Sequence, residues 1–282
     1  MVALGDGLTI GQSRDESRAT DASPDEAAWL EREGITSFRV TDSPLVSKVA
    51  AALTRIVDDG LPGVFVYVFD DLWAMGEALR DHVSRMMAQR YELLPDLWAW
   101  SIAPGKRGWR PHRGVATSLF DRRAPELLNA WIALGDVPAD RSCIHAVPLD
   151  DDPHYPSSLD HLDAPLESAR AFPVDAGCAL VWNANVLHWG GPCSPRTTTP
   201  RVSCSFSLGR AGHTESAWGK PMSTSTHTTF EQRLELIATQ IAVYGKDHEK
   251  VAPEVTEWAA AFLQLSRHFE QLKELNQSRK EG

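Results

Sequence analysis

Residues 178–191 read CALVWNANVLHWGG, two short apolar runs that are separated by asparagines and closed by a pair of glycines. Similar runs rich in Trp, Val and Ile occur between residues 97 and 208, with Pro, Gly and Asp between them: LWAWSIA (97–103), NAWIALGDV (129–137), CIHAVP (143–148) and RVSCSFSL (201–208). Short β-prone runs with turn residues between them are typical of an all-β sandwich or barrel. The sequence therefore predicts a jelly-roll core over residues 97–210.

Helical patterns flank this predicted core on both sides. Ser23 is a capping residue, Pro24 suits the first helical position, and Asp25 and Glu26 supply acids to the first turn, so a helix should begin here. Further helices are expected over about 45–58 and 70–90, and at 230–244 and 254–279, and the apolar run 64–69 is interpreted as a strand. We expect a frayed N-terminus (1–22) and a single domain (23–282), with helical support (23–96), the β core (97–210), and a lid loop with C-terminal helices (211–282).

Composition limits the partners of the chain. It has 282 residues, a formal net charge of −10 and a pI near 5.5, which argue against binding to a nucleic-acid polymer or an anionic membrane. No run approaches the roughly 18 apolar residues of a membrane span, and the four cysteines (Cys143, Cys178, Cys193 and Cys204) form no CxxC pair. We expect a cytoplasmic protein with reduced thiols and a small-molecule substrate; its oligomeric state is not predicted.

Two of the ten histidines stand apart from the rest. His112 (GWRPHRG) and His188 (NANVLHWGG) each lie where a β run meets a Gly- or Pro-rich turn. His145 is interpreted as a packed strand residue, and the acidic stretch LDHLDAP (159–165) as a solvated loop rather than a metal site. The others are assigned to surface positions on helices (His82 and His268) or to polar loops (His154, His161, His213, His227 and His248).

The order His112, Gly114, His188, Arg201, Ser203 on a predicted jelly roll resembles the iron(II)/2-oxoglutarate-dependent oxygenases, in particular their phytanoyl-CoA dioxygenase-like branch. The resemblance covers about 97–210 and implies a double-stranded β-helix of the cupin-like type. It implies that the two histidines bind iron, with oxygen as cosubstrate. It also implies cosubstrate-binding residues, in which Arg201 grips the far carboxylate of 2-oxoglutarate, Ser203 assists it and Trp131 lies beside it.

The departure from this family is Gly114, which stands where the family has an Asp or Glu ligand. Chloride in place of the carboxylate would leave the total charge around iron unchanged, and glycine removes side-chain atoms that would collide with a halide. H-x-G is similar to the radical halogenases of the superfamily, so the resemblance implies chlorination with Gly114 as the halide site. The alternatives are a hydroxylase whose iron takes water or a distant acid, of which Asp121 is the nearest downstream, and a non-catalytic binding protein.

Basic and aromatic residues near the first histidine bear on the substrate. Each basic residue alone fits a solvated loop, but as a group beside a site mouth they suit an anionic substrate. The basic residues are Lys106, Arg107, Arg110, Arg113 and Arg210, and the tryptophans that could stack on an aromatic ring are Trp98, Trp109, Trp182 and Trp189. A nucleotide such as a deoxyadenosine phosphate is the leading expectation, ahead of an amino acid or an alkaloid, with Trp109, Arg110 and Arg113 as substrate contacts.

Overall fold

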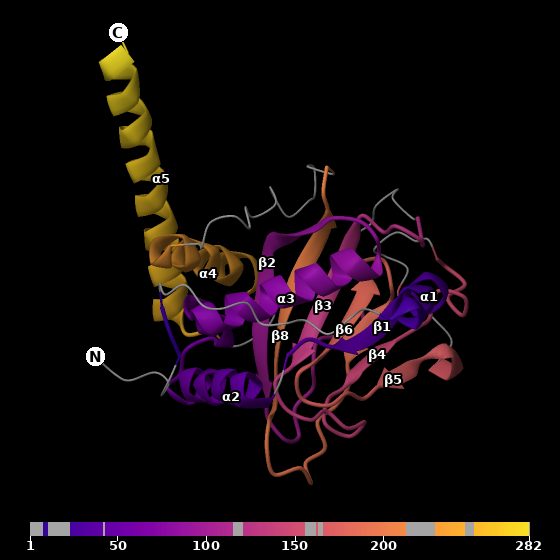
Figure 1. The fold of residues 1–282 in the computed structure, drawn as a ribbon. Coiled ribbons are helices and arrows are strands. Elements are labelled where there is room, and N and C mark those ends of the chain that lie inside the picture. The colour runs from indigo at the N-terminus through magenta and orange to yellow at the C-terminus, as the bar shows by residue number, and fades with distance from the viewer. Residues whose placement is uncertain are drawn as a thin grey trace.

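The computed structural model describes residues 8–10, 23–41, 43–114, 121–155, 162, 166–212, 229–245 and 251–281 (Figure 1). Most of the predicted frayed N-terminus and most of the predicted lid loop lie outside these residues. The segment 8–10 is held against the body of the protein, because the Thr9 N–H donates to the Asp71 carboxylate over 3.0 Å. The LDHLDAP stretch also lies outside the described residues, apart from Leu162.

Two antiparallel sheets form the predicted jelly-roll core. The larger sheet has the order β1-β6-β3-β8-β2, with every neighbouring pair antiparallel. The smaller sheet has the order β5-β4-β7. The strands are β1 (Ile35–Arg39), β2 (Tyr91–Ile102), β3 (Leu127–Ala133), β4 (Ile144–Ala146), β5 (Arg170–Phe172), β6 (Cys178–Asn183), β7 (His188–Gly190) and β8 (Arg201–Arg210).

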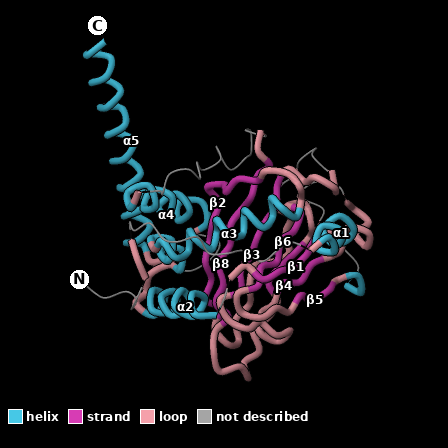
Figure 2. The backbone as a smooth tube through the Cα atoms, viewed as in Figure 1, coloured by secondary structure: helices cyan, strands magenta, loops and turns pink. Residues whose placement is uncertain are grey.

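The two faces of the large sheet bury different partners. One face packs on the smaller sheet, where Trp131 and Leu180 share a buried cluster with Ile144 and Ala146. The other face is covered by helices, with α3 crossing it as Figures 1 and 2 show. The helices are α1 (Pro24–Glu33), α2 (Ser43–Asp58), α3 (Asp70–Met86), α4 (Phe230–Tyr244) and α5 (Pro253–Glu281), with short 3-10 turns η1 (Gly63–Val68) and η2 (Leu166–Ser168). Sheets and helices together form one layered body around the core.

The start of α1 follows its capping signal. The Ser23 hydroxyl accepts a hydrogen bond from the Asp25 N–H, Pro24 opens the first turn, and Gly34 ends the helix with a φ of 76°. A side chain at Gly34 would also collide with Leu149, because an added Cβ would lie 2.5 Å from its Cγ. Glycine is therefore required at this turn into β1 by both backbone conformation and space.

Two local predictions are wrong. Residues 64–69 were expected to form a strand, but Gly63–Val68 is a 3-10 helix whose side chains are largely buried. A short apolar run buried on all sides does not distinguish strand from helix by its periodicity. His82 was expected at the surface of a helix, but it is fully buried, stacks on Phe38 at 3.8 Å and bonds to Glu26 over 2.7 Å. Helix α3 is covered by neighbouring elements on the side that carries this histidine.

The remaining expectations about the chain as a whole concern cysteines and membranes. All four cysteines are free thiols, as predicted. Within the part of the chain that the structure describes, no helix combines the length and the apolar character needed to cross a membrane.

Candidate active site

The two predicted ligand histidines lie directly opposite each other on neighbouring antiparallel segments. The His112 N–H donates to the His188 carbonyl and the reverse bond also forms, both at 3.0 Å. The approach depends on Gly108 and Gly190, because a Cβ added at Gly108 would lie only 2.6 Å from the Cα of Gly190. Opposite residues in an antiparallel pair project to the same face. The two imidazole rings accordingly lie 4.2 Å apart, centre to centre.

Backbone hydrogen bonds orient both rings in the same way. Nδ1 of His112 lies 2.8 Å from the Arg110 carbonyl, and Nδ1 of His188 lies 2.9 Å from the Val186 carbonyl. Each Nδ1 must carry the proton to donate to a carbonyl, so each Nε2 keeps a lone pair. Burial lowers the pKa of both imidazoles, and in His188 the neighbouring His112 lowers it further. Neutral rings with a free Nε2 are the form that binds a metal ion.

Gly114 occupies the third position of the predicted triad, and its surroundings are defined. Its N–H donates to the Ala184 carbonyl over 2.8 Å, and an added Cβ would lie 2.9 Å from Asn129 Nδ2 and 3.0 Å from the Ala184 oxygen. The space beside the glycine Cα is therefore lined by an amide group and a backbone carbonyl. Among the described residues no set of three or more His, Cys, Asp or Glu side chains could hold a metal ion.

Arg201 is a buried cation without a carboxylate partner among the described residues. Arg201 is 3% exposed, and its Nη1 donates to the Ser203 hydroxyl. Its Nε has no hydrogen-bond partner among the residues that the structure describes. The guanidinium lies 5.3 Å from the ring centre of Trp131 and 6.0 Å from that of Trp100. Burial lowers its pKa to about 10, so it stays protonated at neutral pH. A buried, unpaired guanidinium of this kind calls for an anionic ligand.

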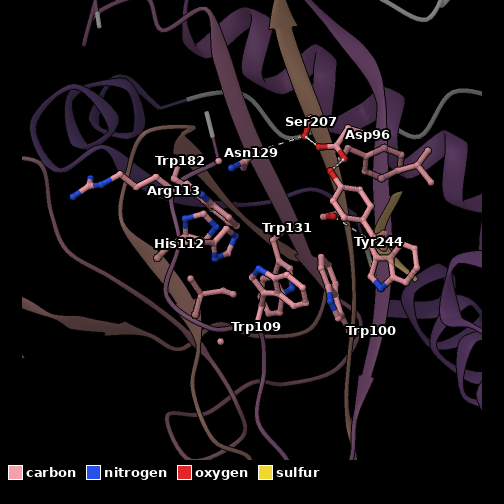
Figure 3. Close-up of a pocket in the computed structure, with 18 of the residues that line it drawn as sticks. Asp96, Trp100, Trp109, His112, Arg113, Asn129, Trp131, Trp182, Ser207 and Tyr244 are labelled. Atoms are coloured by element: carbon pink, nitrogen blue, oxygen red, sulfur yellow. Dashed lines mark hydrogen bonds between the residues drawn. The ribbon is translucent and has the colours of Figure 1, made fainter. Parts of the chain in front are cut away.

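Histidines and arginine open onto one cavity of about 170 Å³. Figure 3 shows His112 and Arg113 on one side of it, Asp96, Ser207 and Tyr244 on the other, and Trp131 between them. The indole N–H groups of Trp131 and Trp182 are buried and have no hydrogen-bond partner among the described residues. The other lining residues that carry polar or aromatic side chains are Trp98, Trp100, Trp109, Asn129, His188, Arg201, Ser205 and Phe206.

The segment that contains this arrangement is similar to a known protein family. The family model of phytanoyl-CoA dioxygenase (PhyH) matches residues 64–201, just under half of the chain, and the match contains His112, His188 and Arg201. The part of the chain that carries the candidate site is thus similar to the phytanoyl-CoA dioxygenase family. A search of curated protein sequences found no significant match.

Solved structures of the same fold accompany the sequence match to this family. The non-heme alpha ketoglutarate dependent carbocyclase SnoK from nogalamycin biosynthesis has a TM-score of 0.55 and 16% identity, over 74% of this chain and 97% of its own. The epimerase SnoN, solved with Fe3+, alpha ketoglutarate and nogalamycin RO, has a TM-score of 0.52 and 18% identity, over 71% of this chain and 94% of its own. HygX from Streptomyces hygroscopicus, solved with nickel, 2-oxoglutarate and hygromycin B, has a TM-score of 0.51 and 16% identity, over 67% of this chain and 88% of its own. These identities show the shared fold.

Other predicted site residues are less well placed to contact a ligand in the cavity. Ser203 contacts the Arg201 guanidinium and is itself fully buried. Trp109 lines the cavity, 6.1 Å from the His112 ring, whereas Trp189 stacks on His145 and is not among the lining residues. Asp121, considered as a distant ligand, is exposed and accepts a hydrogen bond from the Arg123 N–H.

Two of the predicted substrate cations are already paired. Arg113 borders the cavity, but its guanidinium contacts Asp152 over 2.6 and 3.2 Å, and both side chains are fully buried. Arg210 pairs with Glu126 over 3.4 Å. Carboxylates therefore balance the charge of both arginines, which leaves less positive charge for the anionic substrate that the basic group was expected to suit. Arg110, the third predicted contact, is exposed, and its carbonyl orients His112.

The Arg113–Asp152 pair should stabilise the segment that carries His112. Removing one partner of a buried pair leaves the other charge uncompensated, so Arg113→Met should lower the free energy of unfolding by about 3 to 5 kcal/mol. Urea unfolding measures this change. The matched control is Arg123→Met, because Arg123 pairs with Glu31 at the surface, and it should leave the unfolding curve unchanged. Equal effects of the two substitutions would contradict the structural role of Arg113.

Sequence reasoning did not single out five polar residues of the cavity: Asp96, Asn129, Ser205, Ser207 and Tyr244. One signal was available. Arg201, Ser203, Ser205 and Ser207 alternate along β8, and alternate strand residues share a face. The other three come from separate elements, and their proximity depends on the pairing of β2, β3 and β8.

Proposed function

We propose that this chain is an iron(II)/2-oxoglutarate-dependent halogenase that chlorinates an unactivated C–H carbon of a small molecule. The observation that carries the proposal is a paired-histidine site whose third position is a glycine lined by an amide donor. Its nearest alternative is a hydroxylase of the same fold whose iron takes water or an acid from outside the described residues. The two differ in what occupies that third position.

The protein groups fit the two cofactors that the superfamily uses. His112 and His188 would hold iron through Nε2, because their Nδ1 atoms are committed to backbone carbonyls. Arg201 would hold the far carboxylate of 2-oxoglutarate, which supplies the anion that this buried guanidinium lacks. Iron and 2-oxoglutarate held by these residues would, with oxygen, supply the oxidation needed to replace a hydrogen atom of the substrate by chlorine.

Charge balance and hydrogen bonding both favour a halide at the third position. Iron(II), dianionic 2-oxoglutarate and one carboxylate sum to a single negative charge, and a chloride ion in place of the carboxylate gives the same sum. Asn129 Nδ2 faces the site of the missing side chain and has no hydrogen-bond partner among the described residues. An amide N–H aimed at this position can donate to a bound anion. The rest of the wall there is the Ala184 backbone.

The structure gives less support to a nucleotide substrate than to iron- and 2-oxoglutarate-dependent chemistry. Lys106, Arg107 and Arg110 are exposed and could still meet a phosphate at the rim. Arg113 and Arg210 are neutralised by carboxylates, and Arg201 is assigned to 2-oxoglutarate. A deoxyadenosine phosphate is therefore one member of the substrate panel below and not its basis.

Arg201→Ala should weaken 2-oxoglutarate binding without removing iron. Truncating one partner of a buried hydrogen-bonded charge pair costs about 2 to 5 kcal/mol, so the dissociation constant of 2-oxoglutarate should rise by at least one order of magnitude. Anaerobic calorimetry on iron-loaded protein measures it. Arg201→Lys keeps the charge and should fall between parent and alanine variant. An unchanged affinity in Arg201→Ala would refute the assignment.

The test of the proposed function is product analysis. The protein is incubated with iron(II), 2-oxoglutarate, oxygen and chloride together with a panel of nucleotides, amino acids and aromatic amines, and products are examined by mass spectrometry. A halogenase gives a product with the isotope pattern of chlorine. Hydroxylated product alone at saturating chloride would instead establish the hydroxylase.

A further inference from the structure

One end of the cavity carries a carboxylate that the chemistry described above does not use. Asp96 accepts hydrogen bonds from the Ser207 hydroxyl at 2.6 Å and from the Tyr244 hydroxyl at 2.8 Å. Ser207 lies six residues beyond Arg201 on the same face of β8, roughly 20 Å along the strand at about 3.3 Å per residue. Asp96 therefore lies far from the proposed 2-oxoglutarate anchor, and Figure 3 shows it across the cavity from His112.

Asp96 has no cationic partner among the described residues, in contrast to the buried carboxylates of Asp152 and Asp70. Asp152 is paired with Arg113 and Asp70 with Arg233, at 2.6 Å in each case. Asp96 is half-buried and lines the cavity, and the residues that the structure describes give it two neutral hydroxyl donors, one on each oxygen. A carboxylate oxygen can accept more than one hydrogen bond. The carboxylate thus keeps acceptor capacity, and no described residue supplies a cation to balance its charge.

An aromatic pair adjoins this carboxylate, because the Tyr244 hydroxyl bonds to Asp96 and the Tyr244 ring contacts Trp98. Trp98 lines the same cavity and packs edge-to-face on Tyr244, with ring centres 6.0 Å apart. Aromatic faces attract organic cations, and the attraction grows when water is excluded. A carboxylate combined with such rings matches a protonated amine better than it matches a phosphate or a carboxylate.

We propose that Asp96, Ser207, Tyr244 and Trp98 form an amine subsite, which binds the protonated amino group of the substrate. The inference rests on the proposed function in one respect, namely that this cavity is the substrate site. It redirects the substrate class from an anionic nucleotide to an amine-bearing molecule. The reacting carbon would lie between the amine subsite and the paired histidines.

Burial raises the pKa of Asp96, and the hydroxyls of Ser207 and Tyr244 lower it. An ammonium group placed beside the carboxylate would favour its ionised form, because an opposite charge stabilises a charged group. Ligand and carboxylate would then compensate each other inside the cavity, as Arg113 and Asp152 do beside it.

The test uses matched probes on the parent protein loaded anaerobically with iron(II), 2-oxoglutarate and chloride. The probes are 2-phenylethylamine, 2-phenylethanol and 3-phenylpropanoate, and calorimetry gives their affinities. The amine should bind at least tenfold more tightly than the alcohol, and the acid most weakly. Equal affinities, or a preference for the alcohol or the acid, would overturn the proposal without any variant being made.

Two variants separate recognition from structural support. Asp96→Asn should weaken amine binding by about 30-fold or more, as expected for loss of one partner of a buried charge pair, while alcohol and 2-oxoglutarate affinities stay unchanged. Tyr244→Phe removes a hydrogen bond to Asp96 but keeps its charge, so the amine preference should persist. If Asp96→Asn weakens amine and alcohol equally, or Tyr244→Phe abolishes the preference as fully, the carboxylate is structural and the proposal fails.

The same series without chloride, and without iron, distinguishes this proposal from the halogenase proposal. Amine selectivity should persist in both, because Asp96 belongs to neither the halide position nor the iron ligands. Selectivity in a protein that never chlorinates would leave the amine subsite standing and refute only the halogenase. Chlorination of an alcohol or acid substrate with no amine preference would support the halogenase and refute the amine subsite.

Discussion

His188→Ala should abolish iron binding and turnover of 2-oxoglutarate together. In the proposed site two histidines would bind iron and no third protein ligand is present among the described residues, so the loss of one would leave a single imidazole, which is too few to hold iron(II). The hydrogen bond from His188 Nδ1 to the Val186 carbonyl orients the His188 ring, and an alanine side chain has no atom that could take the place of this ring. Metal content after dialysis, with succinate formation as the second readout, measures the effect. His112→Ala should behave in the same way.

His145 provides the matched control for these two substitutions. It lies on β4 opposite Trp189 of β7, the strand that begins with His188. Its ring stacks on that tryptophan with ring centres 5.7 Å apart. His145→Ala removes an imidazole from the same sheet without touching the paired-histidine site, so iron content should match the parent. Near-parental iron and turnover in His188→Ala would show that the ligand assignment is wrong.

Gly114→Asp should eliminate chlorination, because its carboxylate and a halide would compete for one position on iron. The structure adds a steric reason, since the new Cβ would lie 2.9 Å from Asn129 Nδ2 and 3.0 Å from the Ala184 oxygen. Sites of this kind tolerate displacements of only about 0.5 Å, so an inactive variant and a hydroxylating variant both fit. Chlorinated product is quantified by mass spectrometry with the substrate that the panel identifies.

Gly114→Ala separates crowding from competition in this experiment. It adds the same Cβ but no carboxylate, and the nearest atom is the end of the Asn129 side chain, which can move. The alanine variant should therefore still chlorinate, at a reduced rate. Chlorination by Gly114→Asp at the level of Gly114→Ala would contradict the assignment of this position to a halide.

The sequence predicts the fold well because the β runs between residues 97 and 208 have strong local signals. Runs such as CALVWN become β6, and the capping residues around Ser23 start α1 as expected. The paired histidines follow from the resemblance to a known family, which brings together residues far apart in the chain. The run 64–69 fails because burial on all sides removes the periodicity on which a strand assignment depends.

The far end of the cavity could not be predicted in the same way. Asp96 follows Pro95 where the pairing of β2 with β8 shifts register between Leu93 and Leu97, so strand alternation does not place its side chain. Tyr244 comes from the last residue of α4 and reaches Asp96 only through tertiary packing. Ser207 alone carried a usable signal, through its alternation with Arg201. The ion pair of Arg113 could not be predicted either, because its partner Asp152 lies far away in sequence.

The identity of the third ligand beside iron tests the halogenase account most directly. An anaerobic crystal of the protein with iron(II), 2-oxoglutarate and chloride, recorded at a long wavelength where chlorine scatters anomalously, reveals that ligand. The account predicts a chlorine peak next to iron, on the side of Gly114 and within hydrogen-bond reach of Asn129 Nδ2. A water molecule or a carboxylate oxygen in that position at saturating chloride would contradict it.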